Sequence, residues 1–237
     1  MKVRIQFEKH GAIRFTSHKD VARIFERAFA AGGIPVSFSE GFHPHMRMSF
    51  GPPLKTGWES REEYMDVQLD SAADDMAAAV NAKLPEGLRV TRVVAIDDRA
   101  PKLATDIVVV ALEVAVAMDD AITAGVRPGA NGNGAGPDLT AIRAALSNRF
   151  PNTPIAGSNH PRVLEAEVVP EGDTLRIRYT STMDNGRIVT PDEIVSASVG
   201  DPATFGVPLK VTRLAQYVVR DGRQVSPVDE GAVQASS

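Results

Sequence analysis

Apolar and polar residues alternate in several short segments of the first half of the chain. Every second residue from Val3 to Phe7 is apolar, which predicts a strand over residues 2–7. The capping pattern Ser71-x-x-Asp74 before an alanine-rich stretch predicts a helix. The alternation of apolar and polar residues also predicts a short strand at 12–15 and four longer strands at 34–38, 46–50, 64–69 and 89–96.

One segment of this half has helical rather than alternating periodicity. From Val21 to Phe29, apolar residues recur at the i, i+3, i+4, i+7 and i+8 positions of an amphipathic helix. Ser17 and Asp20 have the spacing of a capping box, and Gly32 follows the last apolar position. We therefore expect a helix that begins after Ser17 and ends before Gly32.

The second half gives a similar series of elements. A valine-rich strand is expected first, because valine favours extended backbone. Thr190-Pro191-Asp192-Glu193 has the N-cap, the first-turn proline and the glutamate of a helix start. The full series is a strand, a helix, two strands, a helix and a strand: 106–117, 139–149, 163–169, 174–180, 190–199 and 209–219.

Both halves thus have the order β-α-β-β-α-β, once the segment near 40–50 is set aside as an extra hairpin. The predicted fold class is α+β, with two tandem ferredoxin-like halves at 1–98 and 106–219. The Gly/Asn/Pro-rich residues 126–137 predict a flexible insertion in the second half. Residues 220–237 are expected to be a disordered tail.

Composition limits the chemistry without naming a function. The chain has 237 residues, 43% of them hydrophobic, which is enough for a core, and no apolar run is long enough to span a membrane. It contains no cysteine, which excludes disulfides, thiolate metal sites and cysteine nucleophiles from this chain. We expect a cytoplasmic protein, because the charged N-terminus does not resemble a signal peptide. We also expect a protein without a cofactor.

Charge and aromatic residues are unevenly distributed. Residues 1–60 carry nine Lys/Arg against five Asp/Glu, whereas the rest of the chain carries seventeen against twenty-five. Four of the five histidines and seven of the nine phenylalanines also lie in the first fifty residues. A basic, aromatic segment in an acidic chain favours an anionic ligand that is bound locally, and it permits RNA without demanding it.

The most informative segment is Ser39-Glu40-Gly41-Phe42-His43-Pro44-His45-Met46-Arg47-Met48-Ser49-Phe50-Gly51-Pro52-Pro53. If the chain is extended after Pro44, His45, Arg47 and Ser49 share one face, and the apolar residues between them face a core. An arginine in such a strip is well suited to a phosphate or carboxylate. The simpler alternative is the solvated face of an ordinary hairpin.

Two other readings of these residues remain open. His43 and His45 could hold a metal ion, with Glu40, His18 or His10 completing the ligands, although we expect hydrogen bonding to a substrate instead. A histidine near Arg47 could act as a general acid or base in metal-free RNA cleavage.

The start of the first helix could bind an anion beside Arg14 through Ser17, His18 and Lys19, because free N–H groups lie there. Ordinary capping is the alternative. Trp58, the single tryptophan, is interpreted as a packing residue.

Over residues 13–69 the sequence reads IRFTSHKDVARIFERAFAAGGIPVSFSEGFHPHMRMSFGPPLKTGWESREEYMDVQL. This run resembles the bacterial radical-SAM-associated (radical-SAM-linked) protein family, a domain of unknown function found alone or fused behind a radical SAM protein. The resemblance implies cooperation with a radical SAM enzyme as partner. It implies no established activity.

Together these observations predict an accessory, substrate-binding module that works with a separate radical SAM enzyme and binds RNA or another anionic substrate. The expected binding residues are Arg14, Ser17, His18, Lys19, Glu40, His43, His45, Arg47 and Ser49. One alternative is a metal-independent endoribonuclease of tandem ferredoxin-like architecture. Another is a pure protein-interaction module that uses the acidic second half.

Overall fold

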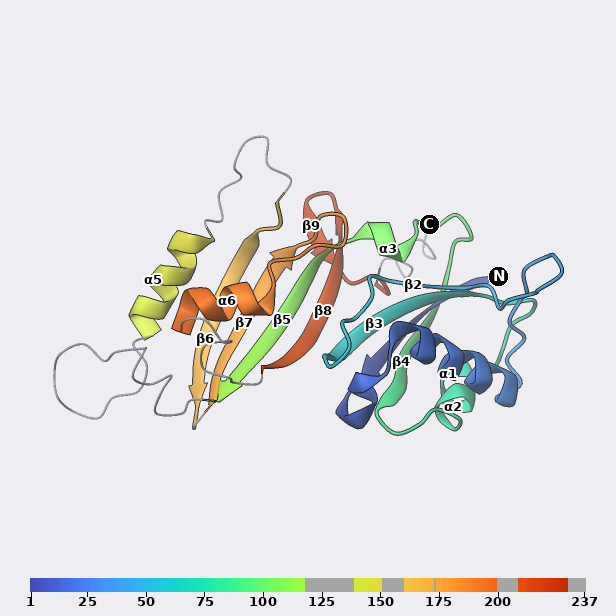
Figure 1. Ribbon diagram of the computed structural model, residues 1–237. Coiled ribbons are helices and arrows are strands. Elements are labelled where there is room, and N and C mark those ends of the chain that lie inside the picture. Colours follow the sequence, from blue (N-terminus) through green and yellow to red (C-terminus); the bar gives the residue numbers. More distant parts are fainter. Residues whose placement is uncertain (118–138, 151–159, 173, 200–208, 230–237) are drawn as a thin grey trace. The chain divides into compact units, whose positions relative to one another are not determined.

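The computed structural model describes residues 1–117, 139–150, 160–172, 174–199 and 209–229 (Figure 1). The protein belongs to the α+β class, because it combines a large sheet with several helices. The described elements are β1 (Lys2–Lys9), η1 (Gly11–Phe15), α1 (His18–Ala31), β2 (Met48–Phe50), β3 (Glu59–Gln68), α2 (Met76–Asn81), β4 (Leu88–Ile96), α3 (Leu103–Asp106), β5 (Ile107–Ala117), α5 (Leu139–Arg149), β6 (Val163–Glu171), β7 (Thr174–Thr182), α6 (Pro191–Val199), β8 (Lys210–Arg220) and β9 (Arg223–Val225).

The chain divides into two compact units. Unit 1 comprises Met1–Val109 together with Arg213–Ser237, and unit 2 comprises Val110–Thr212. Unit 1 is therefore built from two segments that are far apart in the sequence. That the ranges 1–98 and 106–219 fold as separate domains stays a prediction.

The sheet of unit 1 is organised around β1. This strand pairs antiparallel with β3 on one side and with β4 on the other. The short β2 also pairs antiparallel with β3, and β9 pairs with β8. Figure 1 shows α1 and α2 on the same face of this sheet. Val3, Ile5 and Phe7 of β1 point toward that face, where they pack with Phe25 of α1 and Val80 of α2 in one apolar core.

The amphipathic helix predicted after Ser17 is confirmed as α1. Its apolar stripe is buried, with Val21, Phe25, Ala28 and Phe29 in the core. The Ser17 side chain accepts a hydrogen bond from the backbone N–H of Asp20 and so satisfies one of the free donors of the first turn.

Two predicted strands of unit 1 are not strands in the structure. Residues 12–15 belong to the 3₁₀ helix η1, which closes where the Thr16 amide and hydroxyl both donate to the Ile13 carbonyl. The segment 34–38 forms only isolated bridges, such as the one between Val36 and Leu69. It contains Pro35, which has no N–H to donate to a ladder.

The predicted start of the second helix is also wrong. The helix begins at Met76, not directly after Ser71, because Asp75 takes a left-handed conformation and caps it through the amide of Ala78. Helix α3, at Leu103–Asp106, overlaps the expected linker 97–105.

In unit 2 the strands follow the order β5-β7-β6, and β6 pairs antiparallel with β7. Figure 1 shows α5 and α6 on one face of these strands. The predicted capping box before α6 is confirmed: the Glu193 amide donates to Thr190 Oγ1 at 3.3 Å, and the Thr190 amide donates to Glu193 Oε2 at 2.8 Å. The predicted insertion at 126–137 lies outside the described residues.

Part of the expected disordered tail is folded. Residues 223–225 form β9, Val228 is buried, and the Pro227 carbonyl accepts a hydrogen bond from Arg4 Nη1 at 3.2 Å. Residues 230–237 lie outside the described part of the chain. Among the described helices, none has the length and apolar character needed to cross a membrane.

Candidate functional site

The strip predicted after Pro44 is formed and open to solvent. Met48, Ser49 and Phe50 make up β2, and Ser49 lies opposite Asp66 of β3. His45, Arg47 and Ser49 are exposed, whereas Met46, Met48 and Phe50 pack against the core of unit 1. We call His45, Arg47 and Ser49 the motif strip. Within the described residues, no carboxylate forms an ion pair with the Arg47 guanidinium.

The loop before the strip is closed by a pair of hydrogen bonds. The Ser39 amide donates to the His45 carbonyl at 2.8 Å, and the His45 amide donates to Ser39 Oγ at 3.0 Å. Gly41 has a φ of 118°, which is accessible to glycine and strained for other residues. The Phe42 side chain at the tip of this loop is fully exposed. Glu40 and His43 are exposed beside it.

The segment that follows the strip, at Pro52 and Pro53, is held by a buried charged residue. Arg213 Nη1 donates to Glu63 Oε1 and to the Pro52 carbonyl, both at 3.0 Å, and Arg213 Nη2 donates to the Pro53 carbonyl at 3.1 Å. Both charged side chains are buried. Burial raises the pKa of Glu63, although Arg213 acts in the opposite direction. The strip therefore ends at a turn that is fixed by a buried ion pair.

The start of α1 carries the second group of predicted site residues. Ser17 Oγ donates to Asp20 Oδ2 at 2.7 Å, so the carboxylate of this capping box meets the hydroxyl and not the Ser17 amide. Ser17 and Lys19 are exposed. The capping interaction explains this segment without a bound anion.

His18 packs edge-on against Phe50, with ring centroids 5.0 Å apart. Burial, and then the neighbouring Lys9, lowers the pKa of His18 below its usual value. The ammonium of Lys9 is itself buried and donates to the Thr16 carbonyl at 2.9 Å. His18 therefore favours the neutral imidazole.

Arg14 is held by its own neighbours. Its Nη1 donates to Glu59 Oε1 at 3.2 Å, and its guanidinium carbon lies 4.7 Å from the centre of the Phe15 ring. These contacts orient the Arg14 side chain toward η1 and the start of β3.

The structure separates the two groups of predicted site residues. His18 contacts Phe50, which packs on the helix-covered face of the sheet, whereas Ser49 points to the opposite face because neighbouring strand residues alternate. Between His45 and Phe50 the Met48 amide donates to the Met46 carbonyl at 3.0 Å, so the chain makes a tight turn at Arg47 and is not continuously extended as predicted. Glu40 and His43 lie in the loop that leads into the motif strip, whereas Arg14, Ser17, His18 and Lys19 belong to η1 and the start of α1. That the first group forms one binding site stays a prediction.

The alternative metal set is not assembled. In the part of the chain that the structure describes, no group of three or more His, Asp or Glu side chains lies close enough together to hold a metal ion. His43 and His45 therefore do not converge with Glu40, His18 or His10.

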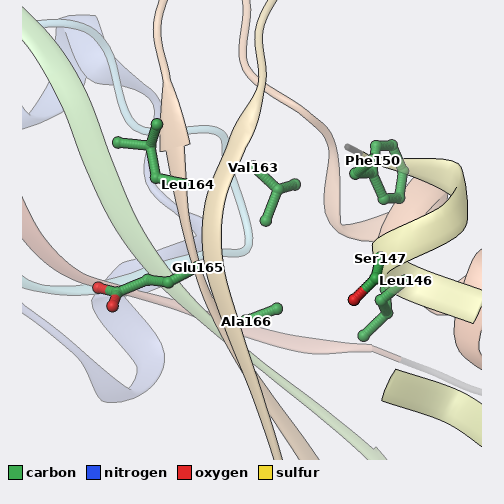
Figure 2. A pocket seen from close by; sticks show the side chains of 7 residues that line it. All are labelled: Leu146, Ser147, Phe150, Val163, Leu164, Glu165 and Ala166. Carbon is green, nitrogen blue, oxygen red and sulfur yellow. The ribbon is translucent and has the colours of Figure 1, made fainter. Parts of the chain in front are cut away.

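A cavity lies in unit 2, and none of the predicted site residues lines it. It has a volume of about 390 Å³ and lies between α5 and β6 (Figure 2). Figure 2 shows Val163 and Ala166 on the side of β6 that faces α5, whereas Glu165 points away from the helix. Its lining mixes apolar and polar groups, and the lining residues are Leu146, Ser147, Phe150, Val163, Leu164, Glu165 and Ala166.

Sequence reasoning missed one feature of unit 1. Phe15 is 63% exposed, and Trp58, interpreted as a packing residue, is only half-buried with the ammonium of Lys55 5.9 Å from its ring centre. The signal in the sequence was the pairing of each aromatic residue with a nearby cation. The strand expected at 12–15 and the treatment of Trp58 as a lone residue obscured it.

A family model described as "uncharacterized protein conserved in bacteria" (DUF2344) matches residues 2–126. No curated protein matches the sequence. A crystal structure of an unknown protein from Galdieria sulphuraria is 14% identical over 90% of this chain and 97% of that chain, with a TM-score of 0.23. A putative glycine cleavage system transcriptional repressor is 8% identical over 89% of this chain and 95% of that chain, with a TM-score of 0.22.

Proposed function

Because this chain belongs to DUF2344, a family of uncharacterized bacterial proteins, we propose its function from its own geometry: it is a non-catalytic accessory module that binds RNA as an anionic substrate and works with a separate radical SAM enzyme. The exposed motif strip is the observation that carries this proposal. His45, Arg47 and Ser49 lie on one exposed face, and the apolar residues between them hold the strip on the core.

The chemistry of the strip suits a phosphate. The Arg47 guanidinium can donate two parallel hydrogen bonds to phosphate oxygens. His45 and Ser49, at the neighbouring positions of the same face, can add single hydrogen bonds. The fully exposed ring of Phe42 offers a surface on which an unpaired base can stack. Electrostatic contacts of this kind make binding salt-dependent.

The partner follows from the resemblance to the radical-SAM-associated family. A radical SAM enzyme needs an iron–sulfur cluster held by cysteines. This chain has no cysteine, so the cluster would have to belong to the partner. A cytoplasmic location is part of the same proposal. Co-expression with a radical SAM protein from the same bacterium, followed by size-exclusion chromatography, tests the association.

We further propose that each half of the chain is a ferredoxin-like fold. The antiparallel pairing of β1 with both β3 and β4 supports this assignment in unit 1, because it fits a split β-α-β arrangement. In unit 2 the strand order β5-β7-β6 and the placement of α5 and α6 on one face support it in the same way.

RNA binding to the full-length protein tests the function. Fluorescence anisotropy of a labelled single-stranded RNA would be measured at 50 and 200 mM salt for wild type and for the His45→Ala/Arg47→Ala variant. We expect the variant to bind at least about tenfold more weakly and with a shallower salt dependence, because a phosphate contact is lost. The matched control is Arg27→Ala/His160→Ala, which removes the same residue types at exposed positions outside the strip.

The same experiment separates the alternatives. His45-dependent cleavage of the RNA in the presence of EDTA would replace the accessory role with that of a metal-independent endoribonuclease. Absence of salt-sensitive binding in wild type would overturn the RNA proposal and favour the protein-interaction module.

A further inference from the structure

Two turns of unit 1 that are distant in sequence form one surface. The Gly57 amide donates to the Arg14 carbonyl at 2.8 Å, which joins the turn before β3 to η1. Glu59 Oε1 accepts from the Gly11 amide and from Arg14 Nη1, each at 3.2 Å. These three bonds hold the two turns together and fix the positions of the side chains that they carry.

This surface combines aromatic rings with cations. Phe15 is 63% exposed although it is a large apolar residue, and the Arg14 guanidinium lies 4.7 Å from its ring centre. Lys55 is exposed and its ammonium lies 5.9 Å from the ring centre of the half-buried Trp58. We call Arg14, Phe15, Lys55 and Trp58 the aromatic patch.

The contacts within the aromatic patch leave binding capacity unused. Arg14 is already paired with Glu59, so its role in the patch is to hold the Phe15 ring in place through a cation–π contact. Lys55 makes no ion pair with any carboxylate in the described residues, so its ammonium remains available to an anion. The patch thus presents a fixed, exposed ring, and the turn that is joined to it carries an available positive charge.

We propose that the aromatic patch is a second contact surface for single-stranded RNA, where an unpaired base stacks on Phe15 and a phosphate meets Lys55. This inference rests on the proposed function and specifies its substrate. Stacking on a protein ring requires a base that is free of its neighbours, which single strands offer and duplexes do not. Stacking uses the π-face that every base has, so we expect little sequence preference.

The single tryptophan of the chain makes the patch directly observable. Because Trp58 is the only tryptophan, fluorescence excited selectively from tryptophan, and not from the three tyrosines, reports on the patch. The full-length protein would be titrated with a single-stranded 12-nucleotide RNA, and in parallel with its duplex. We expect saturable quenching of Trp58 by the single strand, at the same midpoint as the anisotropy of a labelled copy, and little quenching by the duplex.

Variants of Phe15 separate stacking from apolar bulk. Phe15→Leu keeps an apolar side chain without a ring and is expected to weaken binding by about tenfold, whereas Phe15→Tyr keeps the ring and is expected to bind as wild type does. Phe38→Leu makes the same exchange at another exposed phenylalanine, 54% exposed and paired with Met46 beside the motif strip, and as the matched control it should leave the quenching of Trp58 intact. Circular dichroism shows whether each variant is folded.

The outcomes distinguish the patch from the motif strip. If anisotropy shows binding while Trp58 is not quenched and Phe15→Leu binds normally, the patch is overturned and the proposed function stands. If wild type binds no RNA even at low salt, the proposed function fails and the patch fails with it. Equal quenching by single strand and duplex would overturn the stacking mode.

Discussion

At the scale of single residues, unit 1 buries paired charged side chains in addition to its apolar core. Glu63 and Arg213 are both less than a tenth exposed and share two hydrogen bonds of 3.0 and 3.2 Å. Arg4 and Asp66 form a second buried pair, with Arg4 Nε 2.7 Å from Asp66 Oδ1. Breaking such a pair leaves one charge buried without a partner, which costs far more than the pair itself contributes.

Removing Arg213 alone is therefore expected to destabilise unit 1 strongly. Arg213→Met should cost about 3–5 kcal/mol in urea unfolding, and adding Glu63→Gln should recover a large part of that loss. Burial already raises the pKa of Glu63 above the usual 4.5, and the loss of Arg213 raises it further. A raised native pKa makes stability fall as pH increases, so Arg213→Met should be less damaging at pH 5 than at pH 8. Equal losses at the two pH values would contradict this account.

His18 provides a pH-dependent contribution of the opposite sign. Its native pKa is lowered from the usual 6.5, first by burial and then by Lys9, so the unfolded chain takes up the proton more readily than the native protein. Stability present above pH 6.5 should be lost as the pH falls below that value. His18→Asn should show a smaller loss between pH 7.5 and 5.5. Because the side chain is partly exposed, the difference should stay below about 1 kcal/mol.

The residues of the motif strip could be predicted from the sequence, because strand alternation is a local property. His45 to Phe50 alternate between solvent and core as their spacing indicated. The burial of Arg4 and Glu63 could not be predicted in this way. A charged residue in an alternating strand is typical of a solvated face. The partner of Arg4 is Asp66, 62 positions away, and the partner of Glu63 is Arg213, 150 positions away.

At the scale of elements, unit 1 depends on turns with demanding backbone conformations. The turn before β4 contains Gly87 with a φ of +88°, and its carbonyl accepts from the His10 amide at 2.9 Å. A Cβ added at Gly87 would lie 2.3 Å from the His10 carbonyl oxygen, which belongs to the backbone and has little room to move. This close approach links the start of β4 to the end of β1.

Gly87→Ala is therefore expected to be among the most destabilising single changes in unit 1. The alanine would suffer both the unfavourable φ and the clash, so thermal or urea unfolding should show a loss of more than about 2 kcal/mol. Gly33→Ala is the matched control, because Gly33 has a φ of +68° and its added Cβ would meet nothing within 4 Å. That control should lose only about 1–2 kcal/mol through backbone strain. Similar losses in both variants would show that the clash relaxes.

The elements that the sequence predicted well are those with local start and stop signals. Helix α1 begins after Ser17 and α6 begins after Thr190, each at a capping residue. The start of α2 was misplaced because the capping pattern at Ser71 competes with Asp75, whose left-handed backbone has no clear sequence signature. At such positions tertiary packing overrides intrinsic helix propensity and decides where the helix begins.

At the scale of the whole molecule, residues from the end of the described chain complete unit 1. Val228 is buried, Ser226 Oγ lies 3.2 Å from the Tyr64 hydroxyl, and Asp229 pairs with Arg92. Pro227 supplies a carbonyl acceptor to the buried Arg4. Polar residues and a proline made this segment resemble a solvated tail in the sequence, because its partners are all long-range.

Removing residues 223–237 should therefore weaken unit 1 selectively. The deletion exposes apolar surface around Val228 and takes an acceptor from Arg4, so we expect a loss of at least about 3 kcal/mol. Hydrogen exchange can assign this loss: amides of β1 and β3 should exchange faster, whereas those of β6 and β7 should keep their protection. A chain that ends at Asp229 keeps every contact described above and serves as the control. Faster exchange confined to β6 and β7 would contradict the assignment.

The late position of these contacts has a consequence for synthesis on the ribosome. The hydrogen bond from Arg4 Nη1 to the Pro227 carbonyl joins residues that are 223 positions apart in the chain. At ~5–20 residues per second, translation needs on the order of ten seconds or more to reach that acceptor. During this interval the nascent β1 carries a guanidinium without its full set of partners, while all of unit 2 is made. We therefore expect the first-made strands to finish folding only after the ribosome has released the last-made ones.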